Sequence, residues 1–239
     1  PPTSVAEMQR SDRMLCGEFL RQHHARFAHE VALFGVPSPC QPSLTVSQDL
    51  DSEMKDLAGL LARCHWLPVR NMLDCLRTKY HPRVYKGSHM VFLATVLRAA
   101  DYLEIGPERA PQHALRVARL LSPTSRQEWL FNQEVVDITF AEDDPEALSV
   151  TARPTDVRTY LKMRDWLDDF QAELDASWAV LGEVYGRHKT LEHLGLIVRR
   201  VHSNIDDVDA FAKQVSFVPK RVRMEVARAE VLPLLVGPL

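Results

Sequence analysis

An aspartate within an apolar helical stretch is the first candidate for chemistry in this sequence. Residues 91–111 read VFLATVLRAADYLEIGPERAP. At helical spacing Ala94, Leu97 and Asp101 share one face, so we expect Asp101 to point towards a core. A buried carboxylate is costly unless a metal, a base or a hydrogen-bonded partner compensates its charge. Arg98, three residues earlier, is the simpler alternative partner for Asp101.

Histidines supply the other candidate ligands. His23 and His24 are adjacent in a helix that we expect over residues 4–34, and neighbouring helical residues point about 100° apart. Only one of them can therefore face a core, and a solvent-facing polar pair is the alternative. His65 lies near the end of an expected helix over 53–64. There it either interacts with the negative end of that helix or serves as a ligand.

The periodicity of apolar residues defines the elements that position these side chains. Beyond the helices already named and the aspartate helix, we expect helices over 69–80, 111–121, 124–131, 155–187 and 205–215, and another after Pro219. Two alternating stretches, 134–140 and 147–152, predict a β-hairpin, and 194–201 is the candidate third strand. Thr155 or Asp156 can cap the long helix, and Ser203 or Asn204 the helix at 205–215.

The motif LRAADYLEI…ERAP resembles the last-aspartate helix of the HD superfamily of metal-dependent phosphohydrolases, which typically reads L-R-x-A-D-x-L. More narrowly, the chain resembles bacterial proteins in which such a region precedes a GHKL-type ATPase domain, some of them linked to defence. GEFLRQHHARFAHEVALFG at 17–35 and VHSNIDDVDAFA…LLVGPL at 201–239 carry the rest of the resemblance.

The resemblance implies a divalent metal (Mn, Fe, Zn, Ni or Mg) that activates water. Carried over by position, His24 (with His23 as its substitute), His65 and Asp101 would be the metal ligands, and Arg98 would orient Asp101 or meet phosphate. HD hydrolases also use a His-Asp pair, and the sequence contains no His-Asp dipeptide. The family would carry that pair just upstream of a segment like Pro1-Pro2-Thr3, so we expect a chain truncated at both ends.

The predicted fold class is mainly α. An HD-like helical bundle occupies residues 1–122, and a small α+β C-terminal region with the inserted β-hairpin and the long helix occupies 123–239. No flexible linker separates the two regions, so we expect them to pack as one unit.

Composition narrows the function classes. A net charge of −3 over 239 residues gives no general field for nucleic acid, and no apolar run is long enough to span a membrane. The four cysteines form no CxxC pair, which is typical of reduced thiols in a cytoplasmic protein. No phosphate-binding glycine loop is present, so this chain should not bind ATP by itself.

Two functions fit these observations. The first is a phosphohydrolase module that acts on a nucleotide or another phosphate ester. The second is a catalytically inactive HD-like regulatory domain that senses a ligand or partner and controls an adjacent GHKL-type ATPase domain. Expected partners are a small phosphate-bearing ligand and that ATPase domain, and homo-oligomerisation stays open.

Overall fold

Helices dominate the computed structural model, which describes residues 8–36, 49–111 and 123–220. Its described residues form helices α1 (Arg10–Phe34), α2 (Ser52–Cys64), α3 (Val69–Lys79), α4 (Met90–Leu103), α6 (Pro123–Glu134), α7 (Val157–Val184) and α8 (Val208–Ala212) and strands β1 (Val135–Phe140), β2 (Ala147–Ala152) and β3 (Arg200–Ser203). The predicted mainly α fold with a β-hairpin is confirmed. The helices expected at 111–121 and after Pro219 fall almost entirely outside the described residues.

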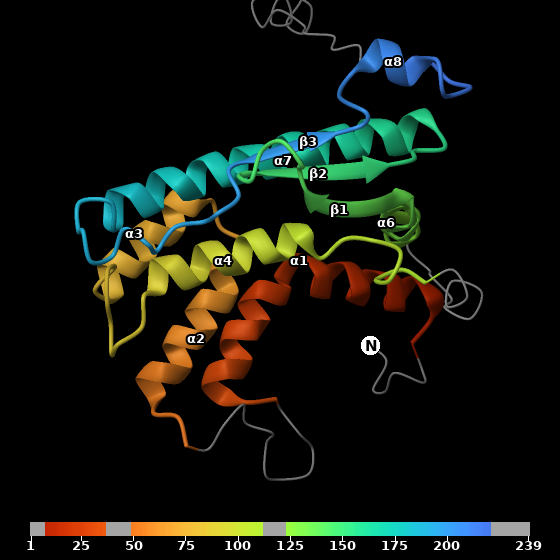
Figure 1. Cartoon of the computed structure of the whole chain (residues 1–239). Coiled ribbons are helices and arrows are strands. Elements are labelled where there is room, and N and C mark those ends of the chain that lie inside the picture. Colours follow the sequence, from red (N-terminus) through yellow and green to blue (C-terminus); the bar gives the residue numbers. More distant parts are fainter. Residues whose placement is uncertain (1–7, 37–48, 112–122, 221–239) are drawn as a thin grey trace, which may run out of the picture.

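Helix α7 packs against most of the other elements (Figure 1). Asp156 caps it by accepting a hydrogen bond from the Thr159 backbone amide, as predicted. The N-terminal half of α7 packs with α6, α8 and the sheet, and its C-terminal end packs with α2, α3 and α4. One long amphipathic helix therefore contributes to each of the three apolar clusters that form the core of the described residues. Among the described helices, none combines the length and apolarity that a bilayer crossing requires.

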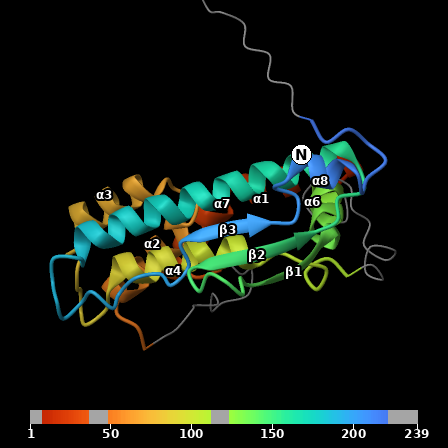
Figure 2. The same cartoon turned by 45° about the horizontal axis from the view of Figure 1, so that its top comes forward.

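The small sheet lies along α7, as Figure 2 shows, and β3 contacts that helix. Strands β1 and β2 form the predicted antiparallel hairpin, and β3 pairs with β2 in parallel. The prediction of a third strand over 194–201 is wrong for most of its length. Leu194 and Leu196 pack against the helical core, and pairing begins only at Arg200.

The predicted caps at Ser203 and Asn204 are also wrong, because both side chains hold the sheet together. The Asn204 side-chain amide donates to the Ala152 carbonyl at 2.9 Å, and its oxygen accepts from the Ala152 amide at 2.8 Å. The Ser203 hydroxyl donates to the Val150 carbonyl. Asn204 thus extends the β2–β3 pairing by one step. The short helix α8 begins later and is capped by Asp207.

Close packing of α1 on α2 depends on a glycine. The two helices lie side by side in Figure 1, below α4. A Cβ atom at Gly59 would lie 2.4 Å from Cδ2 of His29 and 3.0 Å from the His29 Cα. Only a residue without a side chain permits this approach, and the approach brings the C-terminal half of α1 against α2.

A buried carboxylate stabilises the same contact. Asp56 of α2 accepts hydrogen bonds from His29 Nε2 at 3.0 Å and from the Tyr80 hydroxyl, and it pairs with Lys79. Burial raises the pKa of Asp56, but the hydrogen bonds from Lys79, Tyr80 and His29 outweigh it and lower the pKa to about 2. Asp56 therefore links α1, α2 and the end of α3 as a carboxylate.

The Gly59→Ala variant should destabilise the protein, because its methyl group would overlap His29. Overpacking of this kind costs roughly 1–3 kcal/mol. The matched control is Gly182→Ala in α7, where a Cβ would meet open space. This second change should stabilise the helix by about 0.5–1 kcal/mol. Urea denaturation of the two variants checks the pair, and equal effects would contradict the packing described for α1 and α2.

The ion pairing of Asp56 predicts a specific loss of stability in acid. Its folded pKa lies below its unfolded value, so the stabilisation is present above about pH 4 and is lost as the pH falls through about 2. The shift corresponds to about 2 kcal/mol. Asp56→Asn should be less stable at pH 7, and its deficit relative to wild type should shrink between pH 4 and 2. A deficit that does not change with pH in urea titrations would refute this assignment.

Candidate metal centre

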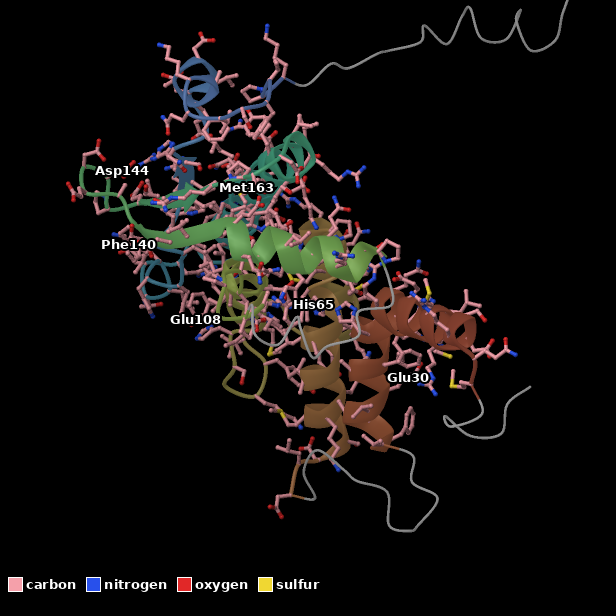
Figure 3. The ribbon with its side chains drawn as sticks, turned by 90° about the vertical axis from the view of Figure 1, so that its right-hand side faces the viewer. Glu30, His65, Glu108, Phe140, Asp144 and Met163 are labelled. Carbon is pink, nitrogen blue, oxygen red and sulfur yellow. The ribbon has the colours of Figure 1, made fainter. Side chains whose placement is uncertain are left out.

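Two histidines from separate helices meet at the end of α2. His24 lies on α1, and His65 is the residue that directly follows the last turn of α2. Their Nε2 atoms are 2.9 Å apart. Figure 3 shows His65 where the ribbons of α1 and α2 come together. Two of the predicted ligands, 41 residues apart in the sequence, are therefore neighbours in space.

The other ring nitrogen of each histidine is held by backbone. Nδ1 of His24 lies 2.7 Å from the Arg21 carbonyl oxygen, and Nδ1 of His65 contacts the Ala62 carbonyl oxygen. Because a carbonyl oxygen can only accept, each Nδ1 must carry a hydrogen. In a neutral ring Nε2 then carries none, and two lone pairs face each other across the 2.9 Å contact. Two such lone pairs repel each other, and a metal ion bound between the two rings would relieve that repulsion.

This arrangement of donors suits a borderline divalent metal. Histidine ligands of metals commonly donate their second ring N–H to a backbone carbonyl, which fixes the tautomer and the ring orientation. For tetrahedral zinc with Zn–N bonds of ~2.0–2.1 Å, the two nitrogens would be roughly 3.3 Å apart. The observed 2.9 Å separation is within a few tenths of an ångström of that value.

The described residues fill only two positions of such a site. In the ranges 8–36, 49–111 and 123–220, no group of three or more His, Cys, Asp or Glu side chains is arranged to hold a metal. The nearest thiol in the sequence, Cys64, is buried, and burial raises its pKa to about 12. The residues present therefore fit part of a metal's coordination shell and do not complete it.

Asp101 does not join the histidines, and the prediction that it faces a core is wrong. Its side chain is exposed. Helix α4 is apolar on almost every face, so periodicity alone could not identify the buried one. Leu97 and Leu93 are 41% and 44% exposed, whereas Ala94 and Arg98 are buried. By helical spacing Asp101 is in line with the buried Met90 and Ala94, but it lies in the last turn of α4, where its side chain is exposed.

Arg98 has a different partner from the predicted one. It forms a buried bidentate ion pair with Glu173 of α7, with both N–O distances 2.5 Å. The side chains are only 7% and 10% exposed. Breaking such a pair by removing one partner typically costs ~3–5 kcal/mol. The prediction that Arg98 orients Asp101 finds no support, because Glu173 takes both of the nitrogens on that side of its guanidinium.

The remaining nitrogen of Arg98 holds the chain segment that carries His65. Nη1 donates to the carbonyls of Cys64 at 2.6 Å and His65 at 3.2 Å, and also to the Leu67 carbonyl. Cys64 is the last residue of α2, and His65 and Leu67 follow it. Carbonyls at this end of a helix lack helical partners and carry partial negative charge. Arg98, on α4, thus neutralises the partial negative charge at the C-terminal end of α2.

The structure shows which of His23 and His24 faces His65, and what His65 contacts at the end of α2. His23 packs between the rings of Phe19 and Phe27 and does not face His65. His65 does interact with the negative end of α2 through its Nδ1, and this contact leaves its Nε2 free for His24. The helix-end role and the ligand role of His65 are therefore compatible.

Sequence reasoning missed two residues at this site, Trp66 and Glu173. The exposed Trp66 ring lies edge-on to His24, with centroids 5.2 Å apart. For Glu173 a signal existed. It lies between Phe170, Leu174 and Ser177 on the buried stripe of α7, where a carboxylate needs a buried cation.

Comparison with known proteins agrees with this picture of a helical HD-type domain. The model of the HD-CE family matches residues 3–176, a span that contains His24, His65, Arg98 and Asp101. No curated protein and no solved structure matches the chain. The family match covers well over half of the sequence, and the chain therefore belongs to the HD-CE family and carries an HD-type domain.

Proposed function

We propose that this chain is the HD-type module of a metal-dependent phosphohydrolase that acts on a nucleotide or another phosphate ester. The observation that carries the proposal is the contact between the Nε2 atoms of His24 and His65, with both Nδ1 atoms bound to backbone carbonyls. These two side chains would hold a divalent metal, which supplies an activated water and polarises a phosphoryl oxygen. Water and the phosphate ester would occupy the other coordination positions.

A second candidate is favoured by Arg98 and Asp101. Arg98 is buried and bound to Glu173 and to the end of α2, which makes it a poor candidate for contact with phosphate. Asp101 is exposed, and among the described residues it belongs to no group of side chains that could hold a metal. In this alternative the HD-like domain has no turnover. It binds a metal or a phosphate-bearing ligand and transmits that state to an adjacent GHKL-type ATPase domain.

Metal affinity distinguishes the proposed ligands, His24 and His65, from the neighbouring His23. Titration calorimetry with Ni²⁺, Zn²⁺ and Mn²⁺ should find one site per chain in the wild type. His24→Gln and His65→Gln should each weaken binding by at least about a hundredfold, because each removes one of two protein ligands. His23→Gln is the matched control and should bind as the wild type does. Unaltered affinity in both ligand variants would contradict the proposed site.

Asp101→Ala tests the remaining predicted ligand in the same titration. Because Asp101 is exposed and outside the histidine pair, this variant should keep wild-type metal affinity. A loss equal to that of His65→Gln would instead place Asp101 in the metal's coordination shell.

Turnover decides between the two candidates. The metal-loaded wild type should hydrolyse members of a panel of nucleotides and nitrophenyl phosphate esters, and His65→Gln should not. Stoichiometric metal with no hydrolysis across the panel would reject the phosphohydrolase and leave the regulatory domain. That domain would then be tested by measuring ATP turnover of the ATPase partner with and without metal.

A further inference from the structure

The position of His65 is set by a charged pair that does not touch either histidine ring. Glu173 of α7 binds Nε and Nη2 of Arg98, which fixes the plane of the guanidinium. The fixed plane directs Nη1 towards the carbonyls of Cys64, His65 and Leu67. These three carbonyls span the turn that carries His65, so its backbone is held from α7 through α4.

We propose that Glu173 and Arg98 are a positioning pair for His65. The pair holds Nε2 of His65 at 2.9 Å from Nε2 of His24, close enough for both atoms to bind one metal ion. The proposal deepens the function proposed above and rests on it for the metal. In this proposal Arg98 positions His65, and it neither orients Asp101 nor contacts phosphate.

The two histidines are positioned by independent contacts. His24 follows α1, whose place on α2 depends on Gly59 and on the bond from His29 to Asp56. His65 follows the end of α2, which α4 and α7 hold through Arg98. Loss of the Glu173 charge should therefore release one ring while leaving the other in place, and only their mutual distance should change.

The same helix offers a matched control. Glu183, ten residues after Glu173 on α7, also accepts hydrogen bonds from two arginines, Arg70 and Arg77 of α3. These two ion pairs join α7 to α3, but neither arginine is bound to a backbone carbonyl of the turn that carries His65. Loss of the Glu183 charge should therefore weaken helix packing without moving the histidine.

The experiment compares Glu173→Gln with Glu183→Gln in titrations with Ni²⁺ or Zn²⁺ alone. Glu173→Gln should weaken metal binding by about 10–100-fold, the usual effect of losing a residue that orients a ligand. Glu183→Gln should bind as the wild type does. Urea denaturation of each variant separates affinity from stability. A Glu173→Gln protein that loses stability but keeps wild-type metal affinity would overturn the proposal.

A second variant covers a failure of Glu173→Gln to fold. Arg98→Lys keeps the positive charge, but one ammonium group cannot reach both the carboxylate and three carbonyls. It should show the same weakening of metal binding, and unchanged affinity in a folded Arg98→Lys protein would overturn the proposal.

If the wild type binds no metal, the proposed function fails, and the positioning role is then measured directly. Long-range ¹H–¹⁵N spectra of the imidazoles report the contact between His24 and His65. In Glu173→Gln the signals of both rings should shift, while those of exposed His202 on β3 stay fixed. Unshifted signals of His24 and His65 would overturn the positioning role whatever the metal result.

Discussion

One buried guanidinium connects three of the helices around which this protein folds. Arg98 lies on α4, its carboxylate partner Glu173 lies on α7, and the carbonyls it binds end α2. Each charge would be costly to bury alone, so neither helix can shift away without leaving the other charge uncompensated. The ion pair therefore ties α4 to α7, and the bonds from Arg98 to backbone carbonyls tie α4 to the end of α2.

The histidine pair lies just outside this fixed centre. His65 is held from the side of α4 and α7, and His24 arrives on α1, which packs closely on α2 through Gly59. The N-terminal half of α1 beyond this contact exposes Leu15, Phe19 and Leu20, and Trp66 is 58% exposed next to His24. A cation at the pair would thus lie near the surface, where a phosphate ester or a partner can reach it.

Much of the fold could be predicted from the sequence because its patterns are local. Helix α7 has a single apolar stripe and a capping Asp156, and the hairpin alternates on both sides of its turn. The predictions that were wrong concern features that depend on contacts between distant elements. Helix α4 is apolar on almost every face, so its own periodicity does not indicate that Arg98 is buried while Asp101, in the last turn, is exposed. The third strand starts late because Leu194 and Leu196 are used by the helical core.

The candidate site was predictable only in part, for the same reason. The resemblance to HD proteins identified His24 and His65, and their closeness depends on α1 packing beside α2. The role of Glu173 depends on three elements meeting at Arg98, which no spacing within one helix can indicate. The available signal was a carboxylate, Glu173, on the apolar stripe of α7.

The central claim is that the two Nε2 atoms of His24 and His65 face a shared cation. Anomalous diffraction from crystals grown with Co²⁺ or Zn²⁺ tests it most directly. The account predicts one peak at ~2.0–2.1 Å from both Nε2 atoms, with each Nδ1 still bound to its backbone carbonyl. Histidine rings turned apart, with no metal peak on either Nε2, would contradict it.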